Sequence, residues 1–395
     1  MNDDGAAPQK NAVDISGARG VDASAPVIRA AKSSDLRALV EVEYRCFDSD
    51  RITPRAFRYL LTKGRATTLI AEIDGRVAGY IMVLHNAGTS LARLYSFAVL
   101  PEFRSRGVGG ILLNAAEAAA RDHDCVTMRL EIRKDNASGI SLYKKFGYRQ
   151  FGVHKDYYED GMDALRFEKK LAPHLQLDMV KVPYYTQTLD FTCGPSALMM
   201  AMKALEPSIV MNRRLELRLW RESTTIFMMS GHGGCSPFGL ALAARRRGFD
   251  VELYANDPGG MFADSVRDPQ KKEVIRVVQE DFLHELTQHP VKMQSGPLSV
   301  EEIQREFEQG GMPLVLISSY RIYHEKVPHW VVVTGFDEKY IYVHDPLNHV
   351  ELGRTPTDCI NMPILRTDFQ RMARYGKAGQ KAVIILRRSE SNDEG

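Results

Sequence analysis

Cysteine is scarce in this 395-residue chain, and its five cysteines are scattered without a CxxC pair: Cys46, Cys125, Cys193, Cys235 and Cys359. An odd and unclustered set fits neither a disulfide framework nor a zinc site. The cysteines therefore indicate a reducing compartment such as the cytoplasm, and we expect no bound metal.

The chain also lacks a long apolar run and a strong excess of one charge. No stretch of about 18 apolar residues exists, so we expect no membrane-spanning helix. Residues 1–26 are small and polar, which predicts a disordered tail and no signal peptide. The net charge of +2 argues against a broad nucleic-acid or membrane surface, and we expect neither as a partner.

What remains is an ordinary globular composition, with 44% hydrophobic and 26% charged residues, in a chain long enough for two domains. Strand and helix patterns alternate from residue 27 and predict a mixed α/β domain over 27–172, including a hairpin that turns at Asp74-Gly75. Residues 173–183 are interpreted as a linker and 389–395 as a tail. Residues 184–388 predict an α+β domain with a helical middle, from about 195 to 310, and strands at 313–320, 329–336 and 340–346.

A loop with two arginines and three glycines, "FAVLPEFRSRGVGG" (97–110), leads from a strand into a helix. Small residues let backbone N–H groups converge on an anion, and the helix N-terminus adds partial positive charge. Arginine side chains pair well with phosphate oxygens. The loop is a candidate phosphate site, with a plain structural turn as the alternative.

The order Arg104-x-x-Gly107-x-Gly109 after a strand resembles the pyrophosphate loop of the GNAT acetyltransferases. Residues 130–164 resemble the ribosomal-protein-alanine branch of that family, and the likeness extends over 27–172. It implies a GNAT mixed sheet with flanking helices and acetyl-CoA as acyl donor. The implied cofactor-binding residues are Phe97, Val99, Arg104, Arg106, Gly107, Val108, Gly109, Gly110 and Asn136.

The same resemblance implies two catalytic groups. Glu131, on the strand 127–133, is the candidate base for the acceptor ammonium group, and the alternative is a surface glutamate paired with Arg129 or Arg133. Tyr143 matches the tyrosine that protonates the CoA sulfur, and the alternative is an aromatic core residue. The implied acceptor is a peptide or protein N-terminus, such as a ribosomal protein or a small precursor peptide. Glu159, Asp160 and Asp163 are available to attract its ammonium group.

Cys193 begins a second helix pattern, with Pro195 in the first turn and apolar residues at helical spacing after it. Because a thiolate is stabilised at a helix N-terminus and by an imidazolium, Cys193 is a candidate nucleophile. A hairpin centred near 337–338 would place His329 within about two residues of Asp345, which could orient its ring. Gln187 is the candidate oxyanion donor together with the Cys193 backbone N–H.

These four residues also occur in segments that resemble the papain-like leader peptidases of bacteriocin precursors, over about 180–350. The resemblance implies a papain-like cysteine peptidase or amidase domain. The alternatives are an inert buried Cys193, a different base (His324 or His344), a peptide-binding module that does not cleave, and an amidase for a small metabolite. Cys235 is the rival thiol and is interpreted as structural.

Overall fold

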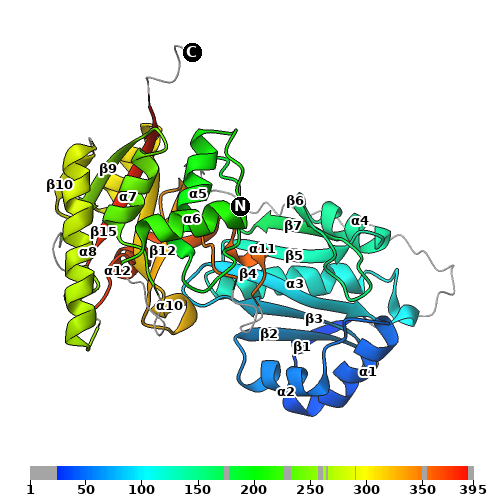
Figure 1. Ribbon diagram of the computed structural model, residues 1–395. Helices are drawn as coiled ribbons and strands as arrows, with labels where there is room; N and C mark the ends of the chain where they lie inside the picture. The colour runs from blue at the N-terminus through cyan, green and yellow to red at the C-terminus, as the bar shows by residue number, and fades with distance from the viewer. Residues whose placement is uncertain are drawn as a thin grey trace, which may run out of the picture.

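The structure is a computed structural model that describes residues 25–172, 178–225, 233–256, 261–263, 266–289, 291–348 and 354–389. The expected tails lie almost wholly outside these residues, as do residues 173–177 of the expected linker. Two lobes, each built on its own sheet, lie side by side (Figure 1).

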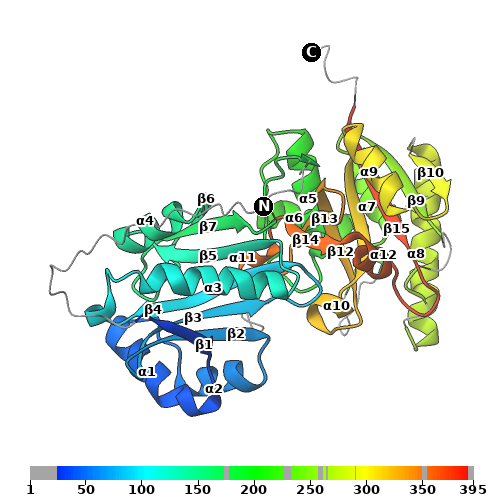
Figure 2. The ribbon, with the colours of Figure 1, turned by 180° about the vertical axis from the view of Figure 1, so that it is seen from behind.

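The first lobe is one mixed sheet with flanking helices, as the sequence predicted. Its strand order is β1-β2-β3-β4-β5-β7-β6, and α3 lies across one face of it (Figure 2). The β2–β3 hairpin turns at Asp74 and Gly75, both with positive φ. Its elements are β1 (Val27–Ala30), η1 (Ser33–Asp35), α1 (Leu36–Cys46), α2 (Pro54–Thr62), β2 (Ala66–Ile73), β3 (Arg76–His85), β4 (Leu91–Val99), η2 (Pro101–Phe103), α3 (Val108–Asp122), β5 (Thr127–Arg133), α4 (Ala137–Lys145), β6 (Arg149–His154) and β7 (Ala164–Lys170).

The second lobe holds a larger sheet in the order β10-β9-β15-β11-β12-β13-β14, with β8 paired to β12. Helix α5 packs against β11 and β12, and its residues 193–202 are buried. The elements are β8 (Asp178–Met179), α5 (Cys193–Leu205), α6 (Arg213–Ser223), α7 (Pro237–Arg245), β9 (Phe249–Ala255), α8 (Pro269–Gln288), β10 (Lys292–Ser295), α9 (Val300–Glu308), β11 (Met312–Ser318), α10 (Tyr320–Tyr323), β12 (Pro328–Phe336), β13 (Tyr340–His344), α11 (Pro356–Cys359), β14 (Met362–Leu365), α12 (Arg366–Met372) and β15 (Ala382–Arg388).

The expectation of a helical middle from about 195 to 310 is only partly right, because strands β9 and β10 interrupt it. Residues 249–255 bury Phe249, Val251, Leu253 and Ala255 and leave the residues between them more exposed. This two-residue period suits a strand, and β15 and β10 supply its hydrogen-bonding neighbours.

The two lobes are in direct contact. Val126 of the first lobe clusters with Tyr340 and Tyr342 of the second, and the Ser90 N–H donates to the Pro363 carbonyl at 2.8 Å. The residues at this junction therefore belong to the packed interior of the protein.

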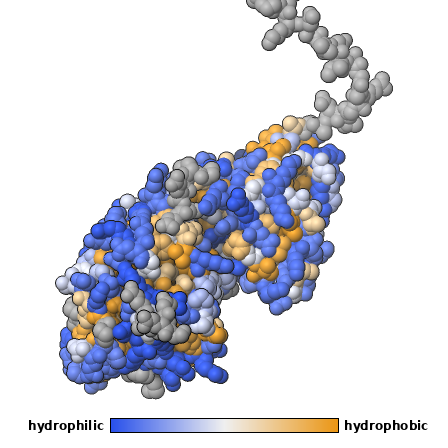
Figure 3. Space-filling model, turned by 90° about the horizontal axis from the view of Figure 1, so that it is seen from above, coloured by the Kyte–Doolittle hydropathy of each residue, from blue (hydrophilic) through white to orange (hydrophobic). Residues whose placement is uncertain are grey.

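Within the described part of the chain, no helix is both long enough and apolar enough to cross a membrane. The face seen in Figure 3 is mostly hydrophilic, with hydrophobic residues in smaller areas between the polar ones.

Candidate active sites

Cys193 is the first residue of α5, and it is 9% exposed. Its N-cap residue, Thr192, makes no side-chain capping bond to the helix. The sulfur therefore lies at the N-terminus of a helix whose first turns are buried, where the helix dipole places partial positive charge.

His329 and Asp345 are brought together by the β12–β13 hairpin. Val332 is paired with His344, so the same register puts His329 two residues away from the position opposite Asp345. Nε2 of His329 is 2.6 Å from Oδ1 of Asp345, and both side chains are buried. The charge at Cys193 acts on the pKa of the His329 ring, so the thiol lies within electrostatic reach of the imidazole.

The electrostatics of this cluster favour a charged imidazole. Burial alone lowers the pKa of His329, but the negative charges of Asp345 and Cys193 and the hydrogen bond to Asp345 outweigh it and raise the pKa to about 10. Burial opposes ionisation of Asp345, yet the charge and hydrogen bond of His329 hold its pKa below the usual value. An imidazolium between a carboxylate and a thiol is the arrangement that activates cysteine nucleophiles.

Two further groups hold the Asp345 carboxylate in place. Tyr323, which the sequence did not single out, donates its hydroxyl to Oδ2 at 2.7 Å. The Leu347 backbone N–H donates to Oδ1 at 2.9 Å. With both oxygens engaged, Asp345 has a fixed orientation and can fix that of the imidazole.

The alternative bases occupy different environments. His344 is buried, which lowers its pKa to about 4, and its Nε2 lies 2.9 Å from the Val182 carbonyl oxygen. Its Nδ1 accepts the Asn361 N–H at 2.9 Å. His324 is exposed at the end of α10. These positions favour His329 as the partner of Cys193.

Gln187 is anchored close to the same loops. Its backbone N–H donates to the Pro346 carbonyl at 2.9 Å, and its Nε2 donates to the Leu189 carbonyl at 2.8 Å. The buried Oε1 has no hydrogen-bond partner among the described residues. Because the amide nitrogen carries two protons, one N–H remains for the predicted oxyanion role.

A buried glutamate organises the segment between Gln187 and Cys193, and the sequence reasoning missed it. Glu216 on α6 is fully buried. Its oxygens accept the Thr188 N–H at 2.7 Å and the hydroxyls of Tyr185, Thr188, Thr192 and Ser196 at 2.5 to 3.5 Å. The sequence did contain a signal for this buried group, since Glu216 is an acidic residue on the apolar face of a helix pattern.

Cys235 lies near Cys193 in a less reactive environment. Its Cβ is 3.2 Å from the place that a Cβ on Gly194 would occupy. Burial first, and then the charge at Cys193, raise the Cys235 pKa well above its ordinary value. This agrees with a structural role for Cys235.

The loop before α3 has the backbone conformation that the sequence suggested for an anion site. Ser105 and Gly107 have φ of 61° and 80°, and Gly107 is the N-cap of α3 without a side-chain capping bond. The space around Gly107 is open, so the first N–H groups of α3 remain for a ligand. Arg104 and Arg106 are both exposed beside it, and Nε of Arg104 donates to the Val99 carbonyl at 2.9 Å.

Other predicted cofactor residues serve packing around the loop. Val108 is buried in the core of the first lobe. A Cβ on Gly110 would lie 2.9 Å from Phe146, and one on Gly109 would lie 3.4 Å from Phe97. The small residues therefore let α3 approach the neighbouring elements closely.

Strands β4 and β5 separate beside this loop. They pair in parallel only from Leu91 and Thr127 to Arg93 and Arg129, although both strands continue beyond these residues. The separated strands leave backbone groups for an elongated ligand such as the pantetheine arm. Together with the open helix N-terminus, this geometry fits acetyl-CoA.

Tyr143 lies on α4 near this separation and is 5% exposed. Its ring centroid is 6.4 Å from that of Phe97. Burial raises its pKa, so it retains its proton at neutral pH, as a general acid must. Asn136 is the N-cap of α4, where its Oδ1 accepts the Gly139 N–H at 2.9 Å.

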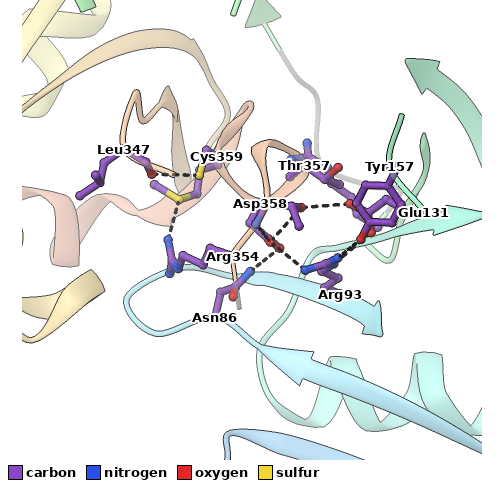
Figure 4. Close-up of polar contacts among 12 residues, drawn as sticks. Asn86, Arg93, Glu131, Tyr157, Leu347, Arg354, Thr357, Asp358 and Cys359 are labelled. Carbon is purple, nitrogen blue, oxygen red and sulfur yellow. Dashed lines mark hydrogen bonds and ion pairs between the residues drawn. The ribbon is translucent and has the colours of Figure 1, made fainter. Parts of the chain in front are cut away.

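Glu131 is held by a buried ion pair that the sequence did not predict (Figure 4). Nε of Arg93 is 3.0 Å from Oε2 of Glu131, and both side chains are 4% exposed. The Thr355 hydroxyl, from the second lobe, donates to Oε1 at 3.0 Å. The alternative of a surface Glu131 paired with Arg129 or Arg133 is wrong, since those arginines bind other carboxylates.

The carboxylates proposed to attract an ammonium group have neighbouring cations. Asp160 is 2.9 Å from Arg133, and Asp163 is 2.7 Å from Lys155. Their predicted role in acceptor binding therefore requires these ion pairs to rearrange.

Comparisons with known proteins agree with both halves of this description. Residues 182–387 match the family model described as Peptidase_C39 like family, and residues 34–148 match that of the acetyltransferase (GNAT) family. The chain is 34% identical over 148 residues to an N-alpha-acetyltransferase of Sulfolobus acidocaldarius, covering 35% of this chain and 88% of that protein. It is 32% identical over 142 residues to a provisionally named [ribosomal protein bS18]-alanine N-acetyltransferase of Bacillus subtilis, covering 35% of this chain and 91% of that protein. The structure of the ribosomal-protein-S18-alanine N-acetyltransferase of Escherichia coli aligns at 23% identity with a TM-score of 0.35, covering 37% of this chain and 94% of that protein.

An acetyltransferase fold with a thioester-cofactor loop and a second lobe with a Cys-His-Asp cluster define the class of protein. The chain belongs to the Peptidase_C39 like family and, through its first lobe, to the GNAT acetyltransferases. N-acetyltransferase function follows from this membership, and acetyl-CoA is the acyl donor of GNAT acetyltransferases.

Proposed function

We propose that the first lobe acetylates the α-amine of a peptide or protein N-terminus, such as that of a ribosomal protein or a small precursor peptide. The names of the relatives support this acceptor, because they are N-alpha-acetyltransferases and a ribosomal-protein-alanine acetyltransferase. All five cysteines are free thiols in the described part of the chain, which supports the expected reducing compartment.

In this proposal, bound acetyl-CoA supplies an acyl group activated as a thioester. The N–H groups that follow Gly107, with Arg104 and Arg106, hold its phosphates. Glu131 accepts the proton of the incoming ammonium group, and Tyr143 donates a proton to the departing thiolate. The place of Tyr143 on α4, with its ring centroid 6.4 Å from that of Phe97 in the predicted cofactor set, supports the acid role.

Acetylation of synthetic peptides tests the acceptor. We expect acetyl-CoA-dependent transfer to peptides with a free α-amine and none to the same peptides with a blocked N-terminus. A matched peptide with a blocked N-terminus and a free lysine separates α-amine from side-chain transfer. Preferential transfer to the lysine would overturn this acceptor.

We propose that the second lobe is a cysteine peptidase or amidase. The observation that carries it is the 2.6 Å contact of His329 with Asp345 beside Cys193. The thiolate attacks the amide carbonyl, and the N–H groups of Gln187 and Cys193 stabilise the oxyanion. The imidazolium then protonates the leaving amine, and water hydrolyses the thioester to return the thiol.

A thiol-directed probe distinguishes this proposal from a peptide-binding module that does not cleave. A hydrolase should label at Cys193 much faster than at Cys235, and Cys193→Ala should abolish both labelling and turnover. Equal labelling of the two cysteines would favour the binding module. Turnover of small amides without turnover of peptides would favour an amidase for a metabolite.

We further propose that the two activities act in sequence on one chain. Cleavage exposes a new N-terminal amine, and the first lobe then acetylates it. The comparison is acetyl incorporation into an uncleaved precursor by the wild type and by Cys193→Ala. Equal incorporation would show that the activities are independent.

A further inference from the structure

The short segment from Arg354 to Cys359 contains α11 and makes contacts on the side of each candidate site. Figure 4 shows Arg354, Asp358 and Cys359 of this segment near Arg93 and Glu131 of the first lobe. It belongs to the second lobe in sequence, but several of its contacts are to the first lobe. These contacts converge on the residues around Glu131.

On the acetyltransferase side, the segment contacts Arg93 and Glu131. Oδ2 of Asp358 is 3.4 Å from Nη1 of Arg93, and the Asp358 side chain is 1% exposed. Nδ2 of Asn86 donates to Oδ1 of Asp358 at 2.9 Å. The Thr355 hydroxyl donates to Glu131 and lies 3.3 Å from Oδ2 of Asp358. One buried guanidinium is therefore shared between two carboxylates, one from each lobe.

On the peptidase side, the same segment reaches the predicted orienting residue. The Cys359 carbonyl accepts the Asp345 N–H at 2.9 Å. The guanidinium carbon of Arg354 lies 4.9 Å from the ring centroid of Tyr323, the residue whose hydroxyl binds Asp345. Contacts to the two sites are therefore made by neighbouring residues of one short segment, Arg354 beside Thr355 and Asp358 beside Cys359.

We infer that Thr355 and Asp358 are positioning residues for acetyl transfer, acting on Glu131 directly and through Arg93. The second lobe thereby completes the acceptor site of the first. Without these contacts Glu131 has a free oxygen and an ion pair of altered geometry, so it is less well held for proton transfer. This inference rests on the proposed role of Glu131 in the acetyltransferase.

Three single variants of the full chain test the direct contact. Thr355→Val keeps the shape and removes the hydroxyl, and we expect kcat for peptide acetylation to fall about tenfold, as for loss of a hydrogen bond to a charged group. The KM for acetyl-CoA should not change. Thr355→Ser retains the hydroxyl and should restore most of the rate, while Thr287→Val on the exposed face of α8 should behave as wild type. A Thr355→Val enzyme with wild-type kcat would overturn the inference.

Asp358→Asn tests the bridge between the sites. It weakens the contact to Arg93 and the capping of α11, so we expect acetylation kcat and the alkylation rate of Cys193 each to fall at least about threefold. A fall in acetylation alone would restrict the role of α11 to the first lobe. If Asp358→Asn does not fold, the Thr355 variants still test whether the second lobe positions Glu131. Failure of the wild type to acetylate peptides would instead reject the proposed function.

Discussion

Replacing Asp345 by Asn probes the electrostatic basis of the hydrolytic site, because it removes one charge and keeps the shape. The rise of the His329 pKa from 6.5 to about 10 corresponds to about 5 kcal/mol in favour of the imidazolium. Even if Asp345 supplies only a third of this, its loss makes the imidazolium about tenfold less favoured relative to the neutral ring. We therefore expect alkylation of Cys193 at pH 6 to slow at least about tenfold.

The pH dependence follows from the same shift. Since the folded-state pKa of His329 is raised, its contribution to stability is fully present below about pH 6.5 and is lost as pH rises toward 10. In Asp345→Asn this loss should be much smaller, and the buried imidazole should destabilise the protein when protonated. Urea unfolding between pH 6 and 9 measures both effects.

Asp337→Asn is the matched control. Asp337 is also buried, in the turn of the same hairpin, but its carboxylate binds the N–H groups of Lys339 and Tyr340 and the Tyr342 hydroxyl. This variant should lose stability and keep the alkylation rate of Cys193 within about twofold. Equal alkylation rates in wild type and Asp345→Asn at pH 6 would refute the proposed activation of the thiol.

Three further predictions concern groups that hold or complete the sites. Tyr143→Phe should lower acetylation kcat by about 10²-fold or more with little change in the KM for acetyl-CoA, as steady-state kinetics would show. A lower thermal stability with an unchanged kcat would instead indicate a packing role. Gly107→Ala places a side chain at φ 80°, so we expect a loss of about 1 kcal/mol in urea unfolding and a higher KM for acetyl-CoA. Glu216→Gln should slow Cys193 alkylation and lower the unfolding midpoint, because a carboxylate that accepts bonds from several donors is replaced; an unchanged midpoint would contradict its role.

Local patterns were sufficient for much of the fold. The turn at Asp74-Gly75 and the helix that starts at Cys193 depend on neighbouring residues, so short-range chemistry specified them. Strand β9 was missed because its alternation is short and lies between helical segments. Its state depends on the neighbours β15 and β10, which come from distant parts of the chain.

The candidate site residues were named from motif spacing, but most of their partners were not. Arg93 occurs in an otherwise apolar strand, which indicates that a buried counter-charge is needed without identifying it. That counter-charge comes partly from Asp358, 265 residues away, and Glu131 meets Thr355 over a separation of 224.

The sequence by itself determined which chemical groups are present and which of them stand at helix ends, strands and turns, because these properties depend on residues close together in the chain. Only the tertiary structure decided that Glu131 is paired with Arg93 and that the segment containing α11 makes contacts on the side of each candidate site. Side chains far apart in sequence meet only when two lobes pack, and burial then makes each charge depend on the partner that packing supplies.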